Sequence, residues 1–341
     1  MTSRERVVKA VNFDFPDRPP VSHAILPSAI IHYGEKLSAV LKDVQEDFGW
    51  EILPDLKPEN YPPYYRKGRG YDGFGTLWET ETMGEYGVPV EMPFSDWKNY
   101  GSYKWPDFEI KPVTARLYSG HMCHPGKEKS PDFYARGGWI QFFEEMQQLR
   151  GFTQVLMDLA EESREIYRLR DDLLQFHLRQ LDKWFTLNYD GLHFADDWGS
   201  QQNLLISPEL WRKFFKPAYR TMFDKVNAAG LDVHFHSDGY ITEIIPDLID
   251  IGVKVLNAQV NVMDMDYIKK HFNGHVCFRT DLDRQKVTLY GTPEEVRKHI
   301  RQVFTHVGSE KGGVIACGEI GRDTPLDSIK AMYETFMTFK F

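Results

Sequence analysis

"DGLHFADDWGSQQNLLISPELWRKFFKPAYRTMFDKVNAAGLDVHFH", residues 190–236, holds two short apolar runs on either side of one long amphipathic segment. The runs at 190–196 and 231–236 alternate apolar with polar side chains, which is typical of strands. Between them, helical spacing relates Trp211, Phe215, Ala218, Met222 and Val226. The stretch therefore predicts a strand, a crossover helix and a second, parallel strand.

The same unit repeats from this stretch to the C-terminus. Further runs that predict strands lie at 253–259, 275–280 and 312–317. These units leave room upstream for about three more, and a (β/α)8 barrel typically needs about 250 residues. We therefore predict an α/β protein whose residues 1–341 form one (β/α)8 TIM-barrel domain. A doubly wound open sheet is the alternative, but the sequence lacks the glycine-rich phosphate fingerprint that usually follows its first strand.

Three of the predicted helices begin with a hydroxyl residue followed by proline. The pairs are Ser207-Pro208, Thr292-Pro293 and Thr324-Pro325. The hydroxyl predicts an N-cap, and proline suits the first helical turn because its missing N–H group would have no partner there. Glu295 also completes a capping box with Thr292. We therefore place helix starts at these three positions.

The first half of the chain is less regular. A first strand is predicted within 17–26, and a long amphipathic helix is predicted at 163–185. Between them, residues 58–108 contain 13 aromatic side chains among many glycines and prolines. We predict an irregular, aromatic-rich insertion with some strand. It either packs its rings together or forms an apolar lid for an aromatic substrate.

Composition limits the possible partners. The formal net charge of −9 argues against a nucleic-acid surface or a patch for anionic membranes, because both need clustered Lys and Arg. No apolar run approaches the roughly 20 residues of a membrane span, and the N-terminus lacks a signal-peptide core, so we predict a cytoplasmic protein. Cys123, Cys277 and Cys317 form no CxxC pair and are expected to be reduced. The sequence carries no signal for an oligomeric state.

Polar and ionisable residues end five consecutive predicted strands. If the apolar residues of each strand face the helices, the alternation of side chains turns the polar ones inward. The inward residues are His193 and Asp197, His234 and His236, Asn257 and Gln259, Arg279 and Asp281, and Cys317 and Glu319. Barrel enzymes keep their active sites at the C-terminal ends of their strands, and so many polar groups would be costly in a plain core. We therefore predict a functional site there.

Within this region, His236, Asp238 and Cys317 are competent zinc ligands. Three protein ligands would leave a fourth position open for a substrate atom. The alternative is a structural histidine, with His236 hydrogen-bonded to Asp238 or Asp197 and no metal. Asp196 points away from the site in the predicted register and is expected to cap the following loop.

Blocks along nearly the whole chain resemble the uroporphyrinogen decarboxylase-like superfamily. They are RERVVKAVNFDFPDRPPV (4–21), LRGFTQVLMDL (149–159), DGLHFADDWGSQQNLLISPELWRKFFKP (190–217), HFHSDGYITEIIPDLIDIGVKVLNAQ (234–259), GTPEEVRKHI (291–300) and GEIGRDTPLDSIKAM (318–332). The superfamily includes uroporphyrinogen decarboxylase and the zinc-dependent corrinoid methyltransferases. The resemblance implies a (β/α)8 barrel independently of the strand pattern. Because one barrel hosts different reactions, the activity has to be inferred from the site.

Two motifs separate the activities within the superfamily. The decarboxylases carry an Arg-Gln-Ala-Gly-Arg motif after the first strand that binds substrate carboxylates, whereas the corresponding SHAILPSAIIHYG (22–34) has no arginine. The methyltransferases bind zinc through His-x-Cys after the fifth strand and a second cysteine after the eighth. His236 matches the histidine, Asp238 replaces the first cysteine, and Cys317 lies at or one residue before the second. The resemblance therefore implies a zinc site, in which carboxylate ligation gives a more Lewis-acidic ion.

We accordingly predict a corrinoid-dependent methyltransferase. It would move a methyl group between a small substrate, such as a methoxylated aromatic that undergoes O-demethylation, and the cobalt of a corrinoid (cobalamin) carried by a partner protein. Zn2+ would activate the substrate heteroatom. The predicted roles are metal binding for His236, Asp238 and Cys317, catalysis for Glu319, Asp197 and His193, and substrate binding for Tyr240, Asn257, Gln259 and Asp281.

Two alternatives remain open. A metal-independent decarboxylase of a smaller substrate would use Asp197, His193 and Glu319 as acid–base groups. A non-catalytic protein that carries a tetrapyrrole or corrinoid would bind its ligand without turnover, although a ring of polar groups is hard to reconcile with mere carriage.

Overall fold

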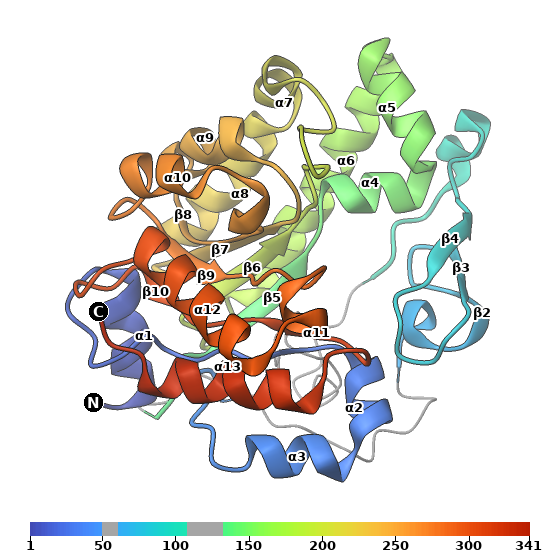
Figure 1. Cartoon of the computed structure of the whole chain (residues 1–341). Coiled ribbons are helices and arrows are strands. Elements are labelled where there is room, and N and C mark those ends of the chain that lie inside the picture. The colour runs from blue at the N-terminus through green and yellow to red at the C-terminus, as the bar shows by residue number, and fades with distance from the viewer. Residues whose placement is uncertain (50–60, 108–131) are drawn as a thin grey trace.

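The computed structural model describes residues 1–49, 61–107 and 132–341. A parallel sheet of six strands forms its centre, in the order β10-β9-β8-β7-β6-β5 (Figure 1). The strands are β5 (Arg136–Ile140), β6 (Gly191–Ala195), β7 (Asp232–Ser237), β8 (Val253–Ala258), β9 (Cys277–Thr280) and β10 (Val314–Ile315). The strands predicted from residue 190 onward correspond to β6 through β10, and each pairs in parallel with its neighbour in the chain.

The sheet continues into a closed ring through the two ends of the chain. β1 (Ala24–Ile25) pairs in parallel with β11 (Glu319–Ile320), and Val21 bridges the residue directly after β10. On the other side of the first strand, the carbonyl of Val21 accepts a hydrogen bond from the N–H of Asp47 (2.9 Å). The carbonyl of Asp47 in turn accepts a hydrogen bond from the N–H of Tyr134 (3.0 Å), just before β5. Asp47 therefore fills the second barrel position, and the predicted (β/α)8 barrel is confirmed.

Helices surround this ring (Figure 1). They are α1 (Ser3–Val11), α2 (Pro27–Tyr33), α3 (Glu35–Leu41), α4 (Phe143–Arg150), α5 (Phe152–Ala160), α6 (Arg164–Trp184), α7 (Pro208–Phe214), α8 (Lys216–Ala228), α9 (Ile245–Asp250), α10 (Met265–His271), α11 (Val287–Tyr290), α12 (Pro293–Val307) and α13 (Leu326–Thr338). Within the described ranges, none of them combines the length and apolarity needed to cross a bilayer. Phe194 and Phe235 face outward and pack against Phe223 of α8, with ring centroids 4.8 and 6.0 Å apart. The polar residues that alternate with them consequently point into the ring.

Two of the three predicted helix starts are confirmed. The hydroxyl of Ser207 caps α7, and Thr292 forms the predicted capping box at the start of α12. The third prediction is wrong, because α13 has Pro325 as its N-cap residue and no side-chain cap. The hydroxyl of Thr324 is engaged in the preceding turn instead, where it accepts a hydrogen bond from a backbone N–H group.

The amphipathic segment after β6 is two helices and not the single helix that its spacing predicted. α7 ends at Phe214, and α8 begins at Lys216. The break falls beside Pro217, which has no N–H group for the helical ladder and whose ring clashes with the carbonyl four residues earlier. The predicted apolar positions nevertheless face the core, because all of them are buried.

The insertion forms a small antiparallel sheet beside the barrel (Figure 1). Its order is β2-β3-β4, with β2 at Gly68–Tyr71, β3 at Leu77–Thr80 and β4 at Val88–Glu91. Trp78 of β3 packs its ring with those of Tyr64, Tyr65 and Tyr86, and the contacting rings have centroid distances of 5.3 to 5.4 Å. The predicted mixture of strand and irregular segments is therefore present in residues 61–107. Residues 58–60, residue 108 and Cys123 lie outside the described residues.

Candidate active site

Two loops at the C-terminal end of the barrel are joined to each other. One follows β6 and carries Asp197, and the other follows β7 and carries Asp238. The N–H of Gly199 donates to the carbonyl of Asp238 (3.1 Å), and the N–H of Asp238 donates to Oδ1 of Asp197 (2.8 Å). The loops approach this closely because Gly199 and Gly239 meet where a Cβ atom would not fit. Two carboxylates from different strands are thereby held side by side.

Replacement of Gly239 by alanine is expected to weaken zinc binding at the predicted site and to lower the free energy of unfolding. Gly239 has a φ of +79°, which costs other residues about 1–2 kcal/mol, and an added Cβ would strike the backbone of Gly199. Gly230→Ala is the matched control, because Gly230 has a φ of +74° and nothing within 4 Å of an added Cβ. Metal analysis and urea unfolding measure both variants. Equal losses in the two would contradict a role for the close approach.

His236, Asp197 and Asp238 bring three potential metal ligands together. His236 Nε2 lies 3.4 Å from Asp197 Oδ1 and 3.6 Å from Asp238 Oδ1. Their ligand atoms lie within 4.8 Å of one another, and the described residues contain no other such group. Asn257 orients the ring, since its Oδ1 accepts from His236 Nδ1 (2.8 Å) while its Nδ2 donates to the carbonyl of Arg279 (2.9 Å). Nδ1 therefore carries a proton, and Nε2 is directed at the two carboxylates.

The charges of these three groups depend on one another. Burial lowers the pKa of His236, but the charges of Asp238 and Asp197 outweigh burial and raise this pKa to about 9. Burial raises the pKa of Asp238, and the charge of Asp197 acts in the same direction. Burial also favours a raised pKa for Asp197, but the hydrogen bond and charge of His236 prevail and lower it. At neutral pH His236 is therefore an imidazolium, and a metal cation would have to displace its proton.

Arg284 connects this trio of residues to the last barrel strand. Its guanidinium forms ion pairs with Oδ2 of Asp238 and, at 2.5 Å, with Oε1 of Glu319. Oδ1 of Asp238 is buried and has no hydrogen-bond partner among the described residues. Glu319 and the trio line the same cavity, so this predicted catalytic carboxyl group does lie at the site.

Asp196 holds the start of α4 against the barrel. Its buried carboxylate accepts hydrogen bonds from the backbone N–H groups of Phe142 (3.0 Å) and Glu144 (2.8 Å) and from the hydroxyl of Tyr219 (2.5 Å). Burial raises the pKa of Asp196 to about 7, although these donors oppose the shift. The carboxylate points away from the site, as predicted, but it caps the helix after β5 and not the following loop. The first turn of α4 thereby gains a fixed place at the barrel end.

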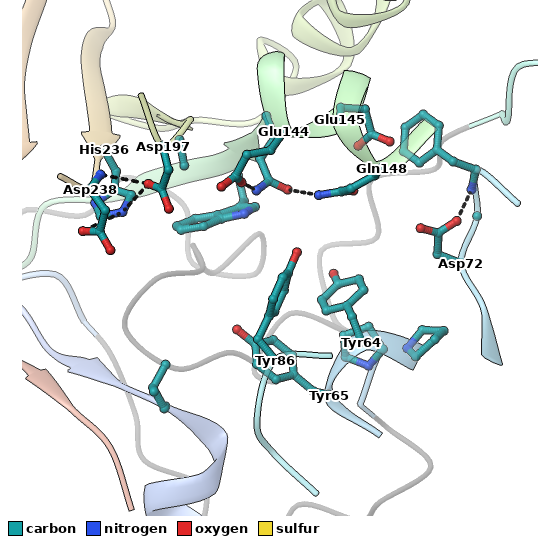
Figure 2. Close-up of a pocket in the computed structure, with 18 of the residues that line it drawn as sticks. Tyr64, Tyr65, Asp72, Tyr86, Glu144, Glu145, Gln148, Asp197, His236 and Asp238 are labelled. Atoms are coloured by element: carbon teal, nitrogen blue, oxygen red, sulfur yellow. Dashed lines mark hydrogen bonds and ion pairs between the residues drawn. The ribbon is translucent and has the colours of Figure 1, made fainter. Parts of the chain in front are cut away.

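A cavity of about 520 Å³ lies between the barrel end and the insertion (Figure 2). The barrel strands, their loops, α4 and the insertion all contribute to its lining, chiefly through Trp139, Asp197, His236, Asp238, Arg284, Glu319, Glu144, Glu145, Gln148, Tyr64, Tyr65, Tyr86 and Asp72. Figure 2 shows the histidine and its two aspartates on one side of the cavity, and tyrosines of the insertion facing α4. The insertion therefore covers the site, and its rings both pack together and line the cavity.

Cys317, predicted as the third metal ligand, lies outside the group of candidate ligands. It follows β10, which is three strands away from β7 around the ring. Its N–H donates to the hydroxyl of Thr280 (2.9 Å), and burial raises the pKa of its thiol. Asp197, predicted as a catalytic residue, completes the group of three candidate ligands instead, because the joined loops bring it to His236.

His193 lies beneath the cavity and not in its lining. Its buried ring stacks on Trp139, which does line the cavity, at a centroid distance of 5.0 Å. Neither ring nitrogen has a hydrogen-bond partner among the described residues. Burial, with the charges of Arg136 and Arg279, lowers the pKa of His193 well below its usual value. A neutral imidazole thus supports Trp139. His193 itself has no direct contact with the cavity, which its predicted catalytic role would require.

The four residues predicted to bind substrate lie behind the described cavity lining. Asn257 orients the histidine ring, and Oε1 of Gln259 accepts a hydrogen bond from the N–H of Gly239 (2.9 Å). Tyr240 packs against the hydrophobic core, and burial raises the pKa of Asp281 to about 7. Asn257 and Gln259 therefore act on the site indirectly, through the groups that carry the candidate ligands.

Arg284, Glu144 and Glu145 line the cavity but were not predicted. Arg284 ends the sequence TDLDR (280–284) after β9, and the glutamates end WIQFFEE (139–145) after β5. All three follow a barrel strand, which is the signal that located the other candidates. β5 was not recognised as a strand because its sequence, RGGWI, has two glycines and little alternation.

A (β/α)8 barrel with polar residues at the C-terminal ends of its strands defines the class of this protein. The uroporphyrinogen decarboxylase (URO-D) family model matches residues 143–339, more than half of the chain, and the chain belongs to this family. A methyltransferase from Methanosarcina mazei shares the fold, with a TM-score of 0.66 and 14% identity over 99% of this chain and 98% of that chain. A Xanthomonas albilineans dihydropteroate synthase, in complex with indole-2-carboxylic acid and 6-chloroguanine, is less similar, with a TM-score of 0.33 and 10% identity over 55% of this chain and 62% of that chain. No curated protein sequence matches the chain.

Proposed function

We propose that this protein transfers a methyl group between a small substrate and the cobalt of a corrinoid carried by a partner protein, with a zinc ion activating the substrate heteroatom. The observation that carries the proposal is the convergence of His236, Asp197 and Asp238 beside a cavity of suitable size for a small molecule. The fold shared with a methyltransferase supports it. A methoxylated aromatic that undergoes O-demethylation is one substrate type that the tyrosines of the lining could stack against.

The residues at the site fit zinc. One imidazole nitrogen and two carboxylate oxygens are ligands that zinc accepts, and a fourth position would stay open for substrate. His236 donates its Nδ1 proton to Asn257, which is the arrangement found around most metal-bound histidines. Oδ1 of Asp238, buried without a hydrogen-bond partner among the described residues, is an atom that a cation would satisfy. We therefore propose Asp197 as the third ligand in place of Cys317.

Zinc, when bound, would supply Lewis-acid activation of the heteroatom that loses the methyl group. The residues of the chain have separate tasks around it. Asn257 keeps Nε2 of His236 directed at the site, and Arg284 holds Asp238 and Glu319 in position. Glu319 lines the cavity beside them and remains the predicted catalytic carboxyl group. The tyrosines of the insertion exclude water from the reacting groups.

The cavity does not suit a polycarboxylate porphyrinogen. Residues 22–34 contain no arginine, and Arg284, the one arginine in the described lining, is already paired with two carboxylates. The same lining has six carboxyl side chains and offers an anionic substrate no unpaired cationic side chain among the described residues. Membership of the family therefore indicates the fold but not decarboxylation of such a substrate.

Metal analysis combined with a methyl-transfer assay tests the proposal. Protein purified without added metal is expected to contain about one zinc per chain. It is expected to convert cob(I)alamin to methylcobalamin, followed by absorbance, with methylated donors that include methoxylated aromatics. A chelator should abolish transfer, and added zinc should restore it. Zinc below about 0.2 per chain, or transfer that survives chelation, would overturn the role of the metal. Absence of methyl transfer in zinc-loaded protein, with cobalamin or with isolated corrinoid proteins, would contradict the proposed methyltransferase activity.

A further inference from the structure

The two ends of the cavity differ in their balance of charge. At the candidate metal site, the carboxylates are accompanied by a histidine and by Arg284. The other end is lined by Asp72, Glu144 and Glu145, and the described lining supplies no cationic side chain there (Figure 2). Carboxyl groups gathered without a counter-charge resist ionisation, and a positively charged ligand would favour their ionised forms.

Glu145 gives the second, independent sign of a ligand. Its side chain is only 7% exposed, and its Oε1 has no hydrogen-bond partner among the described residues. Burial, followed by the charges of Asp72 and Asp196, raises its pKa well above the usual range. Asp72 itself is fully engaged, because its carboxylate accepts two backbone N–H groups and the indole N–H of Trp78. Glu145 thus borders the cavity with a buried carboxyl group that the described residues leave partly unsatisfied, which is the kind of group that a ligand can stabilise.

Aromatic rings face these carboxyl groups across the cavity. Tyr64, Tyr65 and Tyr86 come from the insertion, and Tyr64 and Tyr86 extend toward α4 (Figure 2). Each pair among the three rings has a centroid distance of 5.4 Å. Tyr86 is 51% exposed although it belongs to this packed cluster, so its ring borders open space in the cavity. Aromatic ring faces attract cations, and groups of such rings recognise methylated ammonium ligands.

We propose that the compartment formed by Tyr64, Tyr65, Tyr86, Glu144 and Glu145 binds a methylated ammonium group, so that the substrate of this protein is an organic cation. The inference rests on the proposed function in one respect: the ligand in the cavity is taken to be the substrate that donates or accepts the methyl group. A methylated ammonium group spreads its positive charge over C–H groups, which suits ring faces. Its charge would also lower the raised pKa of Glu145, so that this carboxyl group ionises as the cation binds. A neutral arene offers no such counter-charge.

Isothermal titration with choline and with 3,3-dimethyl-1-butanol tests this inference, since the two molecules have the same shape and differ in the charge of one atom. Choline is expected to bind at least about tenfold more tightly than the neutral alcohol. The preference is expected in both metal-free and zinc-loaded protein, because the compartment contains none of the candidate metal ligands. Equal binding of the two molecules, tighter binding of the alcohol, or no detectable binding of choline would overturn the inference.

Paired variants locate the binding. Tyr86→Leu removes the aromatic face and is expected to weaken choline binding about tenfold, whereas Tyr86→Phe keeps the face and should bind nearly as well as the wild type. Glu145→Gln keeps the shape but cannot ionise when the cation binds, so it should lose most of the preference for choline. Glu161→Gln, at an exposed position after α5, is the matched control and should retain that preference. Thermal unfolding checks that each variant is folded. A preference retained in folded Glu145→Gln would contradict the inference.

The two proposals fail separately. A preference for choline without methyl transfer in any assay would keep the cation compartment and remove the methyltransferase. Zinc-dependent methyl transfer from neutral donors, without any preference for choline, would support the methyltransferase and contradict the cation compartment.

Discussion

Substitution of His236 by alanine is expected to remove bound zinc and methyl transfer together. His236 supplies the one nitrogen among the three candidate ligands, and without it two neighbouring carboxylates would repel each other. Loss of a hydrogen-bond partner behind a ligand typically costs about 10- to 100-fold in metal affinity, so loss of the ligand itself should cost more than about 100-fold. Inductively coupled plasma analysis should then find under about 0.2 zinc per chain, with methyl transfer at background.

His271→Ala is the control for this experiment. His271 lies at the exposed end of α10, where its ring stacks on Tyr267 at 4.2 Å, and it is remote in the fold from the loops that carry the candidate ligands. This variant should keep its zinc and its activity. Circular dichroism of both variants would show whether the fold is retained. A folded His236→Ala protein that still binds one zinc per chain would place the metal elsewhere.

Asp196→Ala is expected to produce the largest loss of stability, lowering the free energy of unfolding by about 3–9 kcal/mol. The substitution leaves three buried donors without their acceptor, namely two backbone N–H groups at the start of α4 and the hydroxyl of Tyr219. Each buried donor without a partner costs about 1–3 kcal/mol. Urea unfolding gives the total, and the loosened first turn of α4 should also weaken the binding of choline through Glu144 and Glu145.

Two further variants separate the contributions of the individual hydrogen bonds of Asp196 to the free energy of unfolding. Tyr219→Phe removes one of the three donors and should cost about 1 kcal/mol. Asp196→Asn keeps one acceptor oxygen and should fall between the other two variants. If Asp196→Ala destabilised the protein no more than Tyr219→Phe, the carboxylate could not be what holds the start of α4.

The strands that can be predicted from the sequence are those in which apolar and polar side chains clearly alternate. β6 and β7 have apolar residues on one side and polar residues on the other, and both lie within one or two residues of their predicted bounds. β5 has no such pattern, because two glycines occupy its centre. At the second barrel position, the backbone hydrogen bonds seen among the described residues come from Asp47, and a single residue carries no periodicity.

The candidate site shows a similar division. His236, Asp238, Asp197 and Glu319 could be named from their positions after strands, because the ends of parallel strands meet at one edge of a barrel. Their position after strands does not show which of these residues lie next to one another. Adjacent loops bring Asp197 to His236 through a glycine contact, whereas Cys317 is kept apart by the strands between it and β7. The sequence pattern indicates which end of the barrel a residue occupies, but not which neighbours it meets there.

The contact through Asp47 also bears on the N-terminal segment. Among the described residues, backbone hydrogen bonds of Asp47 connect Val21 to Tyr134, and its carboxylate is held by Arg6 of α1 (2.6 Å), by Arg18 (2.9 Å) and by the N–H of Val21 (2.7 Å). One buried carboxylate thereby joins α1, the start of the first strand and the segment before β5. Loss of this carboxylate should therefore loosen the N-terminal helix as well as the barrel, although that helix is far from the cavity in sequence.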